Sequence, residues 1–146
     1  AHSGCHAGQA RRADDERGAV KRSKPTPEIK ALDDLCRRLV FTRDRFMCVK
    51  CLHLTKRSNR ERLQWAHIHT RGVHSLRWEP DNSVCLCSGC HLKGHLHPTE
   101  FSRWFEEQYP KRAAHLTLLR QTSRKVDRVG MRLWLEQQIA KLEGER

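Results

Sequence analysis

Two Cys-x2-Cys pairs, Cys48/Cys51 and Cys87/Cys90, are the residues of this 146-residue chain whose types and spacing point most directly to chemistry. Two intervening residues let one tight turn present both thiolates to a single ion, and four thiolates form the tetrahedral set that Zn²⁺ prefers. Cys85 lies beside the second pair, but only Cys87/Cys90 repeats the spacing of the first, so Cys85 is expected to be buried and not a ligand. The sequence therefore predicts a structural zinc site.

Histidines between and after these pairs form a second candidate site. His91 and His95 are four residues apart on a predicted helix, so they share a face and could chelate one ion. His67 ends an apolar strand and shares its face with Trp65, while Asn82 begins a second strand. Taken singly, each of these residues is more often ordinary: a half-buried histidine, a turn asparagine, or a chance pair in a chain with 10 histidines.

Hydrophobic periodicity and turn residues give the elements that must position these side chains. Thr26 and Pro27 are typical of a helix start, and Pro98 should end the helix that carries His91. The sequence predicts helices over 28–44, 88–97, 99–109, 111–121 and 127–142, and strands over 63–68 and 82–86. This order is typical of an α+β fold.

Net charge and cysteine content indicate which partner and which cellular compartment to expect. The formal net charge of +12 favours a polyanionic partner, with nucleic acid the first candidate. Seven cysteines, four of them in Cys-x2-Cys pairs, favour metal ligands in a reducing compartment over a disulfide framework. There is no apolar run of 18 residues and no apolar segment of a secretory signal near residue 1, so a cytoplasmic protein without a membrane partner is expected.

The order of these cysteine, histidine and asparagine residues along the chain resembles that of the HNH endonuclease family. This family has the ββα-metal fold, and the resemblance is to its zinc-knuckle type. The family pattern places a histidine at the end of an apolar strand, then an asparagine, then a Leu-Cys-x2-Cys-His run. Here these are Leu63-Gln-Trp-Ala-His67, Asn82 and Leu86-Cys87-Ser-Gly-Cys90-His91. The resemblance covers roughly residues 44–98, and the Trp78–Asn82 run and His91-x3-His95 are similar to phage-encoded members in particular.

The resemblance implies metal-dependent hydrolysis of DNA phosphodiester bonds, by nicking or double-strand cutting. His67 would be the general base that activates water, and Asn82 would orient its imidazole through a hydrogen bond. His91 and His95 would hold one catalytic divalent ion (Mg²⁺, Mn²⁺, Ni²⁺, Co²⁺ or Zn²⁺). A divalent ion can stabilise charge on the reacting phosphate while a neutral imidazole takes the proton.

Position 66 departs from the family pattern. Many relatives have Asp or His immediately before the base, as a metal ligand, whereas Ala66 cannot bind metal. His69 could replace that ligand if the strand continues past His67; water or His67 itself could also fill the position.

Basic residues flank and enter the histidine-bearing segment, and phosphate contacts from them would give affinity without reading sequence. The candidates for DNA binding are Arg45, Lys50, Arg57, Arg60, Arg71, Arg77 and Lys93. The predicted organisation is a flexible basic arm (1–25), a nuclease domain with a preceding helix (26–110) and a C-terminal helical extension (111–146).

Three functions remain open from sequence. The first is the endonuclease, acting in a bacterial or infected host cell with DNA and, by resemblance, with phage packaging or recombination proteins. The second is a non-catalytic, zinc-containing DNA-binding module, which Ala66 favours. The third, a secreted disulfide-rich protein, agrees least with the paired cysteines.

Overall fold

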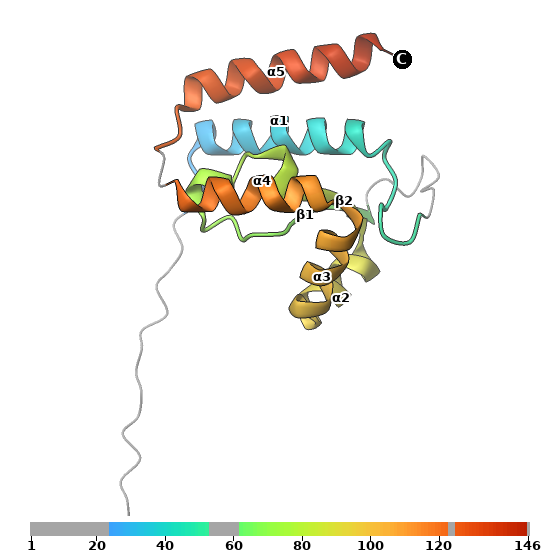
Figure 1. The fold of residues 1–146 in the computed structure, drawn as a ribbon. Coiled ribbons are helices and arrows are strands. Elements are labelled where there is room, and N and C mark those ends of the chain that lie inside the picture. The colour runs from blue at the N-terminus through green and yellow to red at the C-terminus, as the bar shows by residue number, and fades with distance from the viewer. Residues whose placement is uncertain (1–23, 53–61, 123–124, 146) are drawn as a thin grey trace, which may run out of the picture.

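The computed structural model describes residues 24–52, 62–122 and 125–145, and within them it contains five α-helices and one two-stranded sheet (Figure 1). The predicted α+β class is confirmed. Residues 1–23 of the predicted basic arm lie outside the described residues.

Helix α1 (Pro27–Arg43) begins as its sequence predicts. The Thr26 hydroxyl accepts a hydrogen bond from the Ile29 N–H at 3.4 Å, and Pro27 occupies the first turn, where its missing N–H costs nothing. One face of the helix is buried at helical spacing, and its apolar residues there are Leu32, Cys36, Leu39 and Val40. Fully burying a leucine contributes roughly 1.5–3 kcal/mol, so this face accounts for much of the helix's stability.

A β-hairpin follows. Strand β1 (Leu63–His67) pairs antiparallel with β2 (Ser83–Cys87), with Leu63 opposite Cys87 and His67 opposite Ser83. The connection contains two short 3₁₀ helices, η2 (His74–Leu76) and η3 (Pro80–Asn82). Strand β1 ends at His67, and the chain bends at Ile68 and His69.

The remaining elements are helical: α2 (Ser88–Leu96), α3 (Pro98–Gln108), α4 (Pro110–Gln121) and α5 (Arg128–Gly144). Prolines at the starts of α3 and α4 interrupt the preceding helices and fit the first turn of the next. The elements predicted from sequence are all present, with bounds within a few residues of those expected.

Helix α1 lies between α5 and the hairpin. Helices α2 and α3 lie beyond the end of the hairpin where β1 begins and β2 ends (Figure 1). Helices α1 and α5 run in the same direction, as two salt bridges between them show. Arg128 Nη1 lies 2.9 Å from Glu28 Oε2, and Arg38 Nη2 lies 2.7 Å from Glu143 Oε1.

Apolar side chains form two buried clusters, one on each side of the hairpin. The sheet-side core consists of Cys48, Ala66, Leu76, Val84, Leu86, Phe101, Phe105 and Leu116. The helix-pair core consists of Leu32, Cys36, Leu39, Val40, Trp78, Leu135 and Ile139. The hairpin is thereby fixed from both sides, which determines where its histidines can point.

Candidate metal site and histidine pocket

The thiols of Cys48, Cys51, Cys87 and Cys90 converge into one group, the four-cysteine site. Their Sγ atoms all lie within 4.8 Å of one another, and those of Cys51 and Cys87 are 3.9 Å apart. Four ligands at about 2.3 Å from one tetrahedral ion would have sulfur–sulfur distances of about 3.8 Å. The six described cysteines are all free of disulfides. These four cysteines could therefore hold a structural metal ion.

Local backbone geometry explains the convergence. The Leu52 N–H donates to the Cys48 carbonyl at 2.8 Å, so the chain closes a tight turn around the first pair, and this turn ends at Leu52 with a left-handed φ of 55°. Cys87 ends β2 and caps α2, where its Sγ accepts a hydrogen bond from the Cys90 N–H at 3.4 Å. Each pair is thus held by its own turn.

The acidities of the cysteines differ with their surroundings. Burial alone would raise the pKa of Cys48, but hydrogen bonds from the backbone of Cys51, Cys87 and Lys50 lower it to about 7, which favours the thiolate that a metal requires. Burial raises the pKa of Cys85 to about 12, and its thiol lies outside the four-cysteine site. Cys85 is a buried residue, as the spacing of the two cysteine pairs predicted.

A separate cavity of about 680 Å³, the histidine pocket, brings together side chains from β1, the hairpin connection and α2. Its lining residues are Trp65, His67, Thr70, Arg71, Gly72, His74, Arg77, His91 and His95. Three of the histidines singled out from sequence share this pocket, together with Arg71, which could attract an anion, and Arg77, which is paired with Asp33.

His67 is fixed inside this pocket in one orientation. Its Nε2 lies 3.2 Å from the Arg77 carbonyl oxygen, and its ring centroid lies 4.1 Å from that of Trp65. A carbonyl can only accept a hydrogen bond, so Nε2 must carry the proton and Nδ1 is left with a free lone pair. Burial, and then the charge of Arg71, lowers the pKa of His67 to about 4 against the opposing effect of the Arg77 carbonyl. The ring is therefore neutral at pH 7 and able to accept a proton at Nδ1.

Asn82 does not make the expected hydrogen bond to the His67 ring; no such bond occurs among the described residues. Its side chain, 0% exposed, accepts from the His69 N–H at 2.8 Å and donates to the carbonyls of His69 and Leu76 at 2.9 and 3.0 Å. Its own carbonyl accepts from the Ile68 N–H at 2.8 Å. Asn82 therefore fixes the segment that follows His67, and the Arg77 carbonyl takes the orienting role.

His91 and His95 lie one turn apart on α2, with ring centroids 4.5 Å apart. The Nδ1 of His91 contacts the Gln64 Oε1, and burial, followed by the charges of His95 and Arg71, lowers the pKa of His91. Gly94 lets α2 approach Phe101 closely, since a Cβ there would lie 3.3 Å from that ring. Both imidazoles could bind one ion, but they do not form a group of three close ligands with any other described His, Cys, Asp or Glu.

His69 lies outside the histidine pocket, which corrects its expected role as a replacement ligand. Because β1 ends at His67, His69 does not share that face; it lines another cavity with Phe105 and Arg120. Ala66 is 1% exposed and packs in the sheet-side core, so in this fold its side chain points away from the pocket. A side chain at position 66 could therefore not reach the histidine pocket as a metal ligand in this fold.

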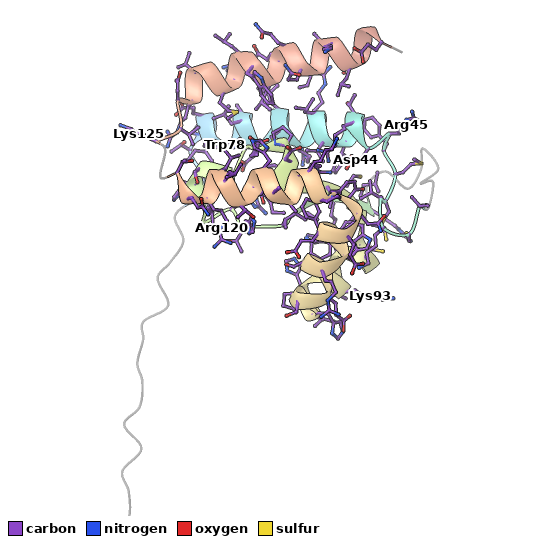
Figure 2. All side chains as sticks on the ribbon, in the orientation of Figure 1. Asp44, Arg45, Trp78, Lys93, Arg120 and Lys125 are labelled. Carbon is purple, nitrogen blue, oxygen red and sulfur yellow. The ribbon has the colours of Figure 1, made fainter. Side chains whose placement is uncertain are left out.

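The candidate DNA-binding residues spread over several surfaces. Arg71 and Arg77 line the histidine pocket, whereas Lys50 Nζ packs 4.9 Å from the Trp104 ring centroid near the four-cysteine site. Arg45, just after α1, and Lys93, on α2, are exposed and lie on different parts of the surface (Figure 2). Arg57 and Arg60 lie outside the described residues.

Three residues that touch the pocket or support it were missed from sequence: Asp33, Gln64 and His74. Asp33 contacts Arg77, Gln64 contacts His91, and His74 lies in the pocket lining. Gln64 gave no usable signal, because side chains alternate along a strand and Gln64 is on the opposite face from Trp65 and His67. Asp33 and His74 gave none, because their positions depend on how α1 and the hairpin connection pack.

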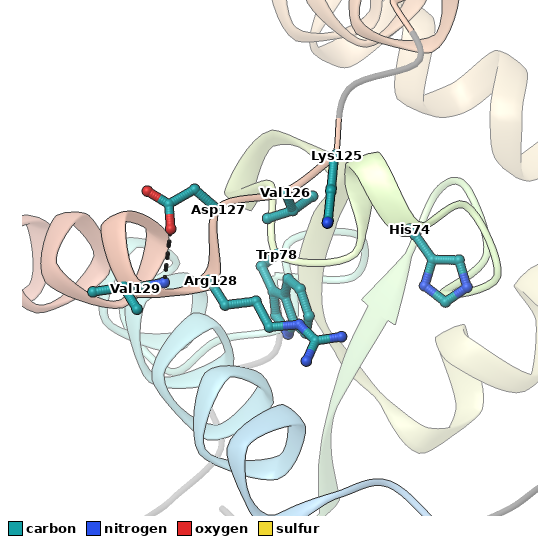
Figure 3. Close-up of a pocket in the computed structure, with 7 residues that line it drawn as sticks. All are labelled: His74, Trp78, Lys125, Val126, Asp127, Arg128 and Val129. Atoms are coloured by element: carbon teal, nitrogen blue, oxygen red, sulfur yellow. Dashed lines mark hydrogen bonds between the residues drawn. The ribbon is translucent and has the colours of Figure 1, made fainter.

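A cluster of acidic and histidine side chains and a second cavity are two further candidate sites. Glu79, Asp81 and His115 have ligand atoms within 4.8 Å of one another, but Asp81 already pairs with His115 at 2.9 Å and with Arg112 at 3.4 Å. A shallow cavity of about 780 Å³ lies beside Trp78 at the start of α5 (Figure 3). It has His74 in common with the histidine pocket but contains neither of the two metal-ligand candidates on α2.

In comparisons with known proteins, no family model, no curated protein and no solved structure matched this chain. Among the described residues, no helix is both long and apolar enough to cross a membrane.

Proposed function

We propose that this protein is a metal-dependent endonuclease of the HNH family, with the ββα-metal fold formed by β1, β2 and α2, and that it hydrolyses DNA phosphodiester bonds. The observation that carries this proposal is the shared pocket of His67, His91 and His95, in which His67 presents a free Nδ1. The order of these residues along the chain agrees with the family pattern. Arg71 in the same pocket suits an anionic substrate, whereas the charge of Arg77 is paired with Asp33.

Each group has a distinct role in this proposal. His67 takes a proton from the attacking water at Nδ1, while the Arg77 carbonyl holds its Nε2–H. His91 and His95 would hold a divalent ion, which would supply Lewis-acid stabilisation of the charge that develops on the phosphate and the leaving oxygen. Asn82 keeps the segment after His67 in place through its three side-chain hydrogen bonds. Two imidazoles alone would not complete the coordination of such an ion, so water and substrate oxygens could also bind it.

The four-cysteine site has a structural role in the same proposal. It joins the segment after α1 to the junction of β2 and α2, so a bound Zn²⁺ would fix α2 against the hairpin. All four ligands are cysteines, which leaves no open position for chemistry.

Cleavage of supercoiled plasmid, with Mg²⁺, Mn²⁺, Co²⁺, Ni²⁺ or Zn²⁺ added in turn, tests the activity. The expected result is conversion to nicked or linear product with at least one of these ions and none in the presence of a chelator. Protein carrying His67→Ala, purified in the same way, controls for contaminating nucleases. Absence of cleavage with every ion would contradict the proposal.

The second candidate is a zinc-containing DNA-binding module without catalysis. It is favoured by the lack of a third close ligand for His91 and His95 among the described residues. Such a protein would bind duplex DNA with an affinity that falls steeply with salt, because bound phosphates release counterions. It would show no metal-stimulated cleavage, so the plasmid assay separates the two candidates.

A further inference from the structure

The peptide group that holds His67 is itself held from outside the hairpin. The carbonyl that contacts His67 Nε2 belongs to the peptide joining Arg77 to Trp78, and both flanking side chains are bound by one carboxylate, that of Asp33 on α1. Asp33 Oδ1 and Oδ2 accept from Arg77 Nε and Nη2 at 2.9 and 2.7 Å. Asp33 Oδ1 also accepts from Trp78 Nε1 at 2.8 Å.

This arrangement leaves the peptide little freedom. The Trp78 ring is 4% exposed and belongs to the helix-pair core, at the base of the shallow cavity beside Arg128 and Val126 (Figure 3). The side chains of Asp33 and Arg77 are 15% and 16% exposed, so their two-point ion pair is poorly accessible to competing water. Three hydrogen bonds to Asp33 restrain the side chains, and through them the Cα atoms, on both sides of the Arg77–Trp78 peptide.

We infer that Asp33 is a positioning residue for the active site: by binding both Arg77 and Trp78, it aims the Arg77 carbonyl at His67 Nε2 and so keeps Nδ1 as the proton acceptor. This inference rests on the base role proposed for His67. Helix α1, which lies outside the hairpin and α2, thereby contributes to the geometry of the reaction. Errors of about 1 Å in such positioning can cost a rate on the order of 10²-fold.

The fold supplies a matched control. Asp34, the next residue on α1, pairs with Arg37 at 2.9 Å on the exposed face, where the two side chains are about half exposed. Asp34→Asn changes the charge of α1 by the same amount as Asp33→Asn without touching Arg77 or Trp78. Asparagine at position 33 keeps the size of the side chain and one acceptor oxygen, but loses the carboxylate that both Arg77 nitrogens require.

The test measures two properties of the zinc-loaded protein at one pH near 7.5. The first is the tautomer of His67, from the ¹⁵N chemical shifts of its imidazole in a ¹⁵N-histidine-labelled sample. Wild type and Asp34→Asn should show the Nε2–H tautomer, and Asp33→Asn a mixture of both tautomers. The second is the single-turnover cleavage rate, expected to fall about tenfold in Asp33→Asn with the half-saturating DNA concentration unchanged within about twofold.

A wild-type tautomer and rate in Asp33→Asn would overturn the inference. So would equal losses in Asp33→Asn and Asp34→Asn. If Asp33→Asn does not bind one zinc or unfolds, Trp78→Phe replaces it: this variant keeps an aromatic ring but removes one hydrogen bond to Asp33, and a smaller tautomer change in the same direction is expected. If wild type cleaves no DNA, the proposed function fails, while the tautomer measurement still decides whether Asp33 orients His67.

Discussion

The four-cysteine site and the histidine pocket are both built from the segment 48–95, yet they are organised in opposite ways. The four thiols face one another within 4.8 Å, and their own turns hold them there. In the pocket, His67 is bound to the Arg77 carbonyl and His91 contacts Gln64, while His95 is exposed.

The difference corresponds to two kinds of metal chemistry. A closed, four-ligand site holds its ion for stability, whereas a site with fewer protein ligands keeps positions for water and substrate. In the histidine pocket the fixed group is His67, the proposed general base, which is held by the Arg77 carbonyl, and no complete set of metal ligands occurs there among the described residues. The two regions should therefore respond differently to loss of one side chain.

The largest expected effect is on the four-cysteine site. Cys87→Ser should abolish stoichiometric zinc binding and lower the free energy of unfolding by on the order of 5 kcal/mol or more, because binding energy at a structural zinc site is folding energy. Zinc content by mass spectrometry and a urea titration would measure both. Cys36→Ala is the control, because Cys36 is a buried residue of the helix-pair core and should change stability without changing zinc content. Full zinc binding in Cys87→Ser would contradict the assignment.

Asn82→Ala should have the next largest effect, on the segment after His67. It leaves the His69 N–H and two carbonyls without their partner in a buried setting, and a loss of about 3 kcal/mol is expected. Thr117→Ala provides a contrast, since its exposed hydroxyl donates to the Ala113 carbonyl and its loss should cost less than about 0.5 kcal/mol. Zinc content should be unchanged in both variants. If Asn82→Ala were as mild as Thr117→Ala, Asn82 would not fix this segment.

The smallest effect concerns pH. Burial alone would raise the pKa of Asp33, but the hydrogen bonds from Arg77 and Trp78 and the charge of Arg77 lower it below its ordinary value of 3.8. Because the folded-state pKa is the lower one, this contribution to stability is complete above 3.8 and is lost as the pH falls through the folded-state pKa. Urea titrations between pH 2.5 and about 6 should show a shallower acid loss of stability in Asp33→Asn than in wild type. Identical pH dependences would show that Asp33 does not bind Arg77 as its carboxylate.

Sequence reasoning succeeded where the signal was local. Spacing alone placed the two cysteine pairs in one group, because the x2 turn fixes each pair and the order of elements brings the pairs together. Periodicity and caps, such as Thr26-Pro27 before α1, located the helices and strands within a few residues. Trp65 and His67 share a face because side chains alternate along a strand.

It failed where the answer depended on where an element ends or on tertiary packing. His69 was expected beside His67, but β1 ends at His67 and the alternation ends with it. Asn82 was expected to orient the imidazole, whereas the Arg77 carbonyl does so through a connection whose path no local pattern specifies. Asp33 lies on α1, 34 residues before His67 in the sequence, and only the packing of α1 against the hairpin connection brings it to Arg77.

A matched pair of variants tests the central claim most directly: single-turnover cleavage of duplex DNA by His67→Ala and by His69→Ala, each zinc-loaded and supplied with the most active divalent ion. The two histidines are two residues apart, but only His67 lines the histidine pocket. The predicted result is a loss on the order of 10²–10⁴-fold for His67→Ala, with DNA affinity retained, and a change of less than about threefold for His69→Ala. Wild-type cleavage by His67→Ala, or an equal loss in both variants, would contradict the account.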